Sequence, residues 1–468
     1  LVYAVILEEE PKRIKLSAIT NEMLEYWNIK EEELHRISLS NMPKHLLYEI
    51  SELYSQTGVD VYLVKGEKNY FGLTTLLYED GPLKDLGNQL NQDLYILPLS
   101  VHEAVIFPYK EWKENENRKP LIIRGARQVG KTWIMKTFGQ QYFEKTAYVN
   151  FDNNARMKQV FEGDLDIERL VLAISAETGV SIEAENTLII FDEVQEVPKA
   201  LTSLKYFHEN APQYAIVAAG SLLGVALHQG TSFPVGKVDF LDLYPLNFRE
   251  FLCAMGEKQF VSMLDSCDTQ MVTVFKTKYI ERLREYYFVG GMPEVVKDFS
   301  EKKDYNRVRA IQKNLINYYQ QDFSKHAEIK LVPRLNLVWN SIPMQLAKEN
   351  KKYIYGQVRE GSRAKDFELA IQWLLDCGLI HKVQRIQKPD LPLKAYIDFD
   401  AFKLFLVDIG LLIAMTDLDA KVIIEGNKIF TEFKGSLTEQ YILQQLISDV
   451  GVIPYYCLLY TSPSPRDT

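Results

Sequence analysis

The chain has 468 residues, of which 47% are hydrophobic and 25% charged, and its net charge is −9. This is the composition of a folded globular protein, and it excludes the collagen-like and disordered classes. A chain of this length needs about three domains, because one hydrophobic core does not grow to that size. No apolar run is long enough to span a membrane, so no membrane partner is expected. The four cysteines include no C-x-x-C pair, which argues against a zinc site or disulfide framework and favours a cytoplasmic location.

Residues 1–106 are predicted to form a separate small α+β domain. Strands are expected at 61–64 and 94–97, together with an acidic helix at 21–39. A resemblance to an uncharacterised bacterial domain family without assigned activity rests on residues 19–24, 27–35 and 93–103. The chain begins with Leu rather than Met, which indicates a fragment.

A phosphate-binding loop is predicted at residues 125–132, which fit the pattern G-x-x-x-x-G-K-[ST]. An apolar strand is expected before it at 121–123, and a helix after it from 133. Its glycines let the backbone fold around phosphates, and the helix N-terminus favours an anion. Lys131 is expected to reach the β- and γ-phosphates of ATP, and the Thr132 hydroxyl to bind Mg²⁺. The predicted nucleotide-binding residues of the loop are Gly125, Ala126, Arg127, Gln128, Val129, Gly130, Lys131 and Thr132.

Two carboxylates follow a second apolar strand, predicted at 187–191. In a parallel sheet the carboxyl ends of the strands are where ligands bind. Asp192 is therefore expected to hold Mg²⁺, and Glu193 to act as the general base that orients the attacking water.

Two further strands, at 146–151 and 214–219, complete a predicted doubly wound sheet. Ser221 follows the second of them and is a candidate sensor of the γ-phosphate, with a plain turn serine as the alternative. Hydrolysis also needs a cation at the γ-phosphate. Lys237 and Arg249 are candidates, and both are equally consistent with surface charges.

Residues 301–400 form the basic part of the chain, with a net charge of +6. Helices are predicted at 334–346, with Pro343 as a kink or break near its end, and at 363–376, followed by a β-like run at 378–386. This order outlines a winged helix, whose second helix would enter the major groove of DNA. The sequence predicts that residues 334–386 bind DNA, or equally that they form a protein–protein module or a spacer that keeps the fold and has lost DNA binding.

From about residue 109 to 456 the chain resembles a bacterial AAA-type ATPase family that joins a P-loop core to a winged-helix region and an endonuclease-like C-terminal domain. The motifs that carry this resemblance lie at 124–132, 191–195, 220–221, 245–251, 290–293 and 433–439. The resemblance implies ATP binding and Mg²⁺-dependent hydrolysis. Relatives often carry Gly-Arg where this chain has Gly-Lys at Lys237. Glu439 matches the first acid of the nuclease-like domain, but the later acid and lysine of that site are absent from the chain.

The fold class expected is α/β: a P-loop NTPase sheet, a helical lid, a winged-helix region and the separate N-terminal domain. The expected divisions are 1–106, 107–255 (ATPase core), 256–300 (lid), 301–415 (winged-helix-like), 416–457 (truncated endonuclease-like) and 458–468. The last stretch resembles a translated sequencing-adapter read and is expected to be an artefact, with a disordered Ser/Pro tail as the alternative. The expected function is ATP hydrolysis coupled to DNA or an unknown protein. The alternative is a nucleotide-gated switch or DNA-binding regulator with negligible turnover, and the sequence leaves a homo-oligomer open.

Overall fold

The computed structural model divides the chain into two compact units, one of residues 1–98 with 262–269 and one of residues 99–261 with 270–468. It describes residues 63–65, 70–72, 109, 111–115, 117–220, 234, 236–266, 269–348, 352–424 and 434–457. In the first unit, β1 (Leu63–Lys65) pairs antiparallel with β2 (Tyr70–Gly72). The helix predicted at 21–39, the strand at 94–97, Ser221 and the tail at 458–468 lie outside the described residues.

The second unit contains a five-stranded sheet in which every strand pair is parallel. Its strands, in spatial order, are β4 (Lys145–Asn150), β5 (Thr187–Asp192), β6 (Ala215–Ala219), β3 (Leu121–Arg124) and β7 (Asp239–Asp242). Every residue of β5 is buried, as expected for a strand covered on both faces. The predicted P-loop NTPase sheet is thus confirmed, and β7 is a strand that the sequence had not indicated.

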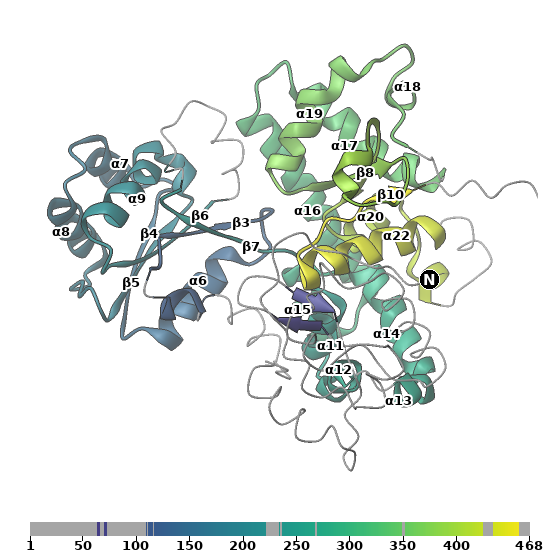
Figure 1. The fold of residues 1–468 in the computed structure, drawn as a ribbon, viewed down its shortest axis with the longest axis horizontal. Coiled ribbons are helices and arrows are strands. Elements are labelled where there is room, and N and C mark those ends of the chain that lie inside the picture. The colour runs from purple at the N-terminus through teal and green to yellow at the C-terminus, as the bar shows by residue number, and fades with distance from the viewer. Residues whose placement is uncertain are drawn as a thin grey trace, which may run out of the picture. The chain divides into compact units, whose positions relative to one another are not determined.

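Helices cover both faces of this sheet (Figure 1). Because neighbouring residues of a strand point to opposite faces, β5 supplies Ile189 to one core and Ile190 to the other. The first core is closed by α7 (Ala155–Glu162), α8 (Ile167–Thr178) and α9 (Pro198–Asn210), and the second by α6 (Lys131–Tyr142).

Mostly helical structure follows the sheet. Its first helices are α11 (Phe248–Ala254), α12 (Lys258–Asp265), α13 (Thr269–Val274), α14 (Lys276–Val289) and α15 (Pro293–Lys302). The next are α16 (Tyr305–His326), α17 (Val332–Ala347), α18 (Tyr355–Val358) and α19 (Ala364–Asp376), and the last are α20 (Ile409–Met415), α21 (Ala420–Ile424) and α22 (Lys434–Gln445). None of the helices described is long and apolar enough to cross a membrane.

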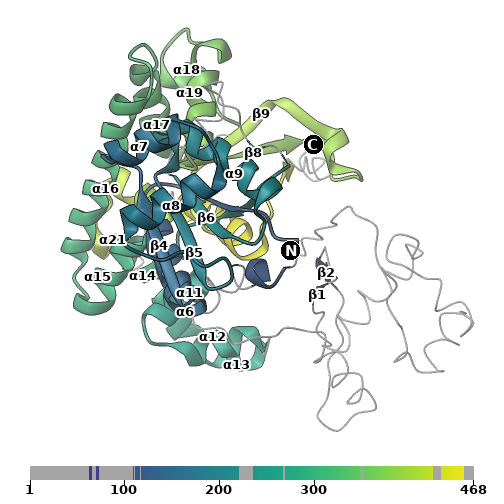
Figure 2. The ribbon, with the colours of Figure 1, turned by 90° about the vertical axis from the view of Figure 1, so that its left-hand side faces the viewer.

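The predicted helix–helix–strand order of the basic segment is confirmed. Helix α17 continues through Pro343, which is buried inside it, and α19 begins and ends within one residue of the predicted bounds. Strand β8 (Ile380–Ile386) then pairs antiparallel with β9 (Ile397–Leu406) to form the long hairpin visible in Figure 2. A short strand, β10 (Tyr456–Cys457), adds parallel to β8.

The buried carboxylate of Asp408 connects α20 and α22 with the turn before α15. Asp408 has no exposed surface, and its two oxygens accept hydrogen bonds from the backbone N–H of Gly291 (2.6 Å) and of Leu411 (3.0 Å). Gln444 of α22 donates a third, at 3.2 Å. Burial raises the pKa of Asp408, although these hydrogen bonds oppose the rise. The carboxylate therefore ties the turn before α15 to the start of α20 and to α22.

We expect Asp408→Ala to lower the free energy of unfolding by about 3 kcal/mol, because two buried N–H groups lose their acceptor. Asp408→Asn keeps one of the two oxygens and should cost about half as much. Urea unfolding followed by circular dichroism measures both changes. Asp400→Asn, at an exposed position of β9, is the matched control and should leave the transition unchanged. Equal transitions for Asp408→Ala and the wild type would contradict this role.

Candidate functional site

The loop of residues 125–132 leaves the carboxyl end of β3 and enters α6. Its backbone has positive φ angles at Gly125 (147°), Gln128 (66°) and Gly130 (98°). A Cβ atom on Gly125 would lie 2.2 Å from the carbonyl oxygen of Leu243, so only glycine fits there. Alternation of left- and right-handed residues turns successive N–H groups toward one side, which is how backbone loops bind anions.

Lys131 lies across this loop. The residue is 6% exposed, and its Nζ donates to the carbonyl oxygens of Gly125 (2.9 Å) and Ala126 (2.8 Å). Burial lowers the pKa of Lys131 to about 8, although the charges of Glu193 and Asp192 act in the opposite direction. A buried ammonium group held over a backbone nest is a site for a polyanion.

Asp192 joins the loop to the neighbouring strands. Its Oδ2 accepts a hydrogen bond from the Thr132 hydroxyl at 2.7 Å and another from the Tyr148 hydroxyl at 2.8 Å. Burial and the bond to Asp192 raise the pKa of Tyr148. The structure thus brings the two predicted metal-binding residues together. It adds Tyr148 of β4, which the sequence analysis missed because a tyrosine in a strand is an ordinary core residue.

These oxygen donors suit Mg²⁺, which takes one or two protein ligands and completes its shell with phosphate oxygens and water. Among the described residues there is no cluster of three or more His, Cys, Asp or Glu side chains that could hold a metal by itself. A metal at this site would therefore depend on Thr132, Asp192 and a bound phosphate.

Glu193 follows β5 in the left-handed backbone region, with φ 50°. Such a conformation is uncommon for a residue other than glycine, and strained residues of this kind cluster at active sites. Its Oε2 accepts a hydrogen bond from the Gln195 side chain at 2.6 Å. Gln195 is a second residue that the sequence analysis did not assign to the site. The amide holds one oxygen of the proposed base in place.

The loop also contacts the C-terminal part of the same unit. The carbonyl oxygen of Arg127 accepts a hydrogen bond from Tyr319 at 2.9 Å, and its guanidinium pairs with Asp322, both on α16. A Cβ atom on Gly378, just before β8, would lie 3.2 Å from the backbone nitrogen of Ala126. Burial alone would lower the pKa of Arg127, but the hydrogen bond and charge of Asp322 raise it, and the charge of Glu193 adds to the rise.

The candidate γ-phosphate cations lie in other ion pairs. Lys237 precedes β7, at the amino edge of the sheet, and its Nζ is 3.1 Å from Glu209. Arg249 of α11 has its Nε 3.8 Å from Asp449.

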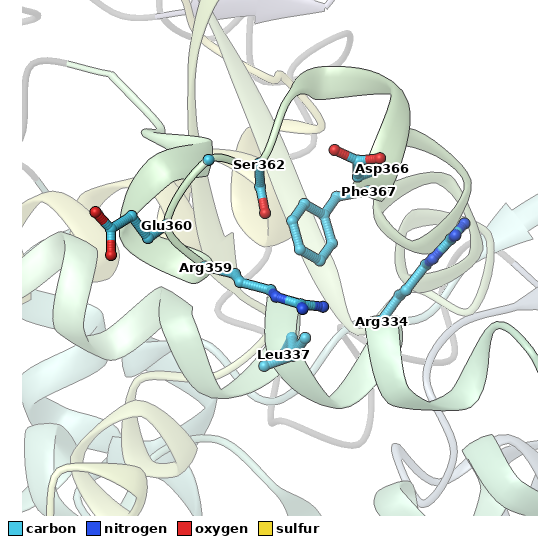
Figure 3. Close-up of a pocket in the computed structure, with 8 residues that line it drawn as sticks. Arg334, Leu337, Arg359, Glu360, Ser362, Asp366 and Phe367 are labelled. Atoms are coloured by element: carbon cyan, nitrogen blue, oxygen red, sulfur yellow. The ribbon is translucent and has the colours of Figure 1, made fainter.

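A pocket of about 300 Å³ lies between α17 and the start of α19. Figure 3 shows the guanidinium groups of Arg334 and Arg359, the hydroxyl of Ser362 and the ring of Phe367 around it. Its other lining residues are Leu337, Glu360, Gly361 and Asp366.

Residues 117–252 match the family model described as AAA domain. The chain contains an AAA domain. The AAA part of the resemblance seen in the sequence is thus confirmed, and the chain carries a nucleotide-binding domain of the ATPase class. Residues 280–422 match a domain of unknown function (DUF8612), and residues 1–124 match a family of unknown function (DUF5688).

The chain is also similar to solved structures at low identity. It matches the ORC1 protein of Aeropyrum pernix in complex with DNA at 12% identity, covering 75% of this chain and 96% of that one, with a TM-score of 0.26. The RuvB Holliday junction branch migration motor of Thermotoga maritima matches at 11% identity, with 62% and 89% coverage and a TM-score of 0.28. Cdc6p of Pyrobaculum aerophilum matches at 10% identity, with 78% and 97% coverage and a TM-score of 0.25. TM-scores this low add nothing to the assignment. No curated protein matches the chain.

Proposed function

We propose that this chain binds ATP with Mg²⁺ at the 125–132 loop and hydrolyses it, and that turnover is coupled to a winged-helix region formed by α17, α19 and the β8–β9 hairpin. The observation that carries this proposal is the 2.7 Å hydrogen bond from Thr132 to Asp192. It unites the loop with the acidic end of β5, and Glu193 comes next in the chain.

Each residue has a distinct task. The loop N–H groups and Lys131 bind the β- and γ-phosphates, while Thr132 and Asp192 hold the metal. Mg²⁺, when bound, would neutralise negative charge on the phosphate oxygens. Tyr148 orients the Asp192 carboxylate through its hydrogen bond.

Glu193 is the proposed general base. A water oxygen attacks the γ-phosphorus, and the bond from that phosphorus to the β–γ bridging oxygen breaks, with its electron pair leaving on ADP. One proton of the water passes to the Glu193 carboxylate and is then released to solvent, which leaves hydrogen phosphate. Gln195 restrains the position of the carboxylate through its hydrogen bond to Oε2.

Lys131→Ala should weaken ATP binding by about 100-fold or more, because a charge-assisted phosphate contact is lost. Glu193→Gln should keep the affinity within about threefold and lower turnover by about 10² to 10⁴. Titration with a fluorescent ATP analogue and steady-state phosphate release measure the two quantities. Lys297→Ala, at an exposed site on α15, is the matched control. Unchanged affinity in Lys131→Ala would disprove the binding site, and full turnover in Glu193→Gln would remove the assigned base.

The affinity for ATP should also depend on pH. The charged form of Lys131 binds phosphate, and its pKa of about 8 in the free chain lies below the ordinary 10.5. Below pH 8 the group is mostly charged, whereas above pH 8 its charged fraction falls about tenfold per pH unit. We therefore expect ATP affinity, measured by calorimetry, to fall by up to about tenfold between pH 8.5 and 9.5. Lys131→Arg stays charged and should not show this fall. A flat wild-type profile would contradict the assignment.

The winged-helix region has one feature that favours DNA over a protein partner. Arg334 and Arg359 line the same pocket, and no ion pair within the described part of the chain involves either residue. Guanidinium groups bind phosphate oxygens in a fixed fork geometry. The net charge of +6 over residues 301–400 adds a field that attracts nucleic acid.

Arg334→Ala and Arg359→Ala should each weaken duplex DNA binding and lower the slope of log affinity against log salt by about one. Fluorescence anisotropy at several salt concentrations measures both effects, and Arg156→Ala on α7 is the control. If the wild type binds no DNA, the region is a protein-binding module or a spacer instead. The alternative function, a nucleotide-gated switch, predicts phosphate release equal to buffer with and without DNA.

A further inference from the structure

An ATPase of this kind needs a positive side chain at the γ-phosphate in addition to the loop lysine. Lys237 pairs with Glu209 at the opposite edge of the sheet from the loop, and Arg249 interacts with Asp449 near the C-terminus. Neither is placed by the described structure at the 125–132 loop. The loop itself, however, contains a third cation.

Arg127 is the third residue of the loop. The carbonyl oxygen of the preceding residue, Ala126, accepts a hydrogen bond from Lys131 Nζ. The Arg127 side chain therefore starts one residue away from a residue that Lys131 contacts. That side chain is 42% exposed, whereas its ion-pair partner Asp322 is 14% exposed. The guanidinium therefore keeps part of its surface open to solvent, while Asp322 is mostly covered.

The charges around the loop point to the same place. Glu193 acts on both Lys131 and Arg127, and the two cations also repel one another. Asp192 acts on Lys131 as well, and Asp322 and Asp152 act on Arg127, so each cation is held by carboxylates before a nucleotide binds. A γ-phosphate between the cations would remove their repulsion, which an uncharged ligand would not do.

We propose that Arg127 is a catalytic residue that leaves Asp322 to contact a γ-phosphate oxygen, and that Asp322 is the positioning residue that holds it before ATP binds. This rests on the proposed function, since it assumes that the loop binds ATP. The exchange costs little because the pair with Asp322 is partly exposed, and such pairs stabilise a protein only slightly. A guanidinium–phosphate contact is bidentate and stronger. Tyr319 holds the Arg127 carbonyl throughout, so the side chain can swing while the loop backbone stays fixed.

The first test compares Arg127→Ala with the wild type. We expect its ADP affinity to stay within about twofold and its turnover to fall by about 10² or more. The complex of ADP with aluminium fluoride, which carries negative charge where the γ-phosphate reacts, should lose its affinity advantage over ADP in the variant. Lys237→Ala and Arg249→Ala are matched controls that should keep both properties.

The outcomes separate this proposal from the proposed function. Unchanged affinity for ADP–aluminium fluoride in Arg127→Ala, with unchanged turnover, overturns the role of Arg127 and leaves ATP hydrolysis standing. Loss of ADP binding in Arg127→Ala also overturns it, since the side chain would then belong to ground-state binding. If Lys131→Ala binds ATP as the wild type does, the proposed function itself fails.

The positioning role of Asp322 has its own measurement. Asp322→Asn removes the competitor for Arg127, so the ratio of ATP to ADP affinity should rise about three- to fivefold. In an Arg127→Ala background the same substitution should have no effect on the ratio, because the residue it frees is gone. Additive effects of the two substitutions, or no change in Asp322→Asn alone, would remove Asp322 from the mechanism.

Discussion

The hydrogen bond from Thr132 to Asp192 is the contact on which the site depends. It spans the sheet, because β6 lies between β3, which leads into the loop, and β5, which ends in the carboxylate. Five parallel strands place all their carboxyl ends at one edge, so the loop and the acids meet there without any special connection. Tyr148, from the strand on the other side of β5, holds the same carboxylate oxygen. Thr132 and Asp192, the proposed metal-binding pair, are therefore positioned by three elements of the sheet.

The loop is also fixed from the C-terminal region. Helix α16 provides Tyr319 to the carbonyl of Arg127 and Asp322 to its guanidinium, and Gly378 packs against Ala126. Further along, the buried Asp408 connects the turn before α15 with α20 and α22. The nucleotide domain and the helices that follow it thus share contacts that include the loop itself. A change in the loop conformation must alter its contacts with α16, because both the backbone and the side chain of one loop residue are bound to that helix.

The elements that the sequence predicted are those with local signals. Strands β5 and β6 are recognised by their apolar runs, and helices α17 and α19 by the helical spacing of their apolar residues. Both patterns lie within a short stretch of neighbouring residues, so they can be read from the sequence. Strand β7 was missed because its four residues, Asp-Phe-Leu-Asp, are too few and too acidic to give such a signal. Tyr319 and Asp322 could not have been found. They lie more than 190 residues from Arg127 in the sequence, and only the folded chain brings them to the loop.

The contact of α16 with the loop also has a thermodynamic consequence. If ATP draws Arg127 away from Asp322, it changes the free energy of the state in which α16 holds the loop. Coupling between two binding events is reciprocal. A macromolecule that stabilises the released position of α16 must therefore tighten ATP binding, and ATP must tighten the binding of that macromolecule by the same factor. The size of this factor is bounded by one partly exposed ion pair, so it is modest, about three- to tenfold. Each ligand would then change the affinity for the other by only a small factor, and neither ligand alone would shift the chain completely from one state to the other.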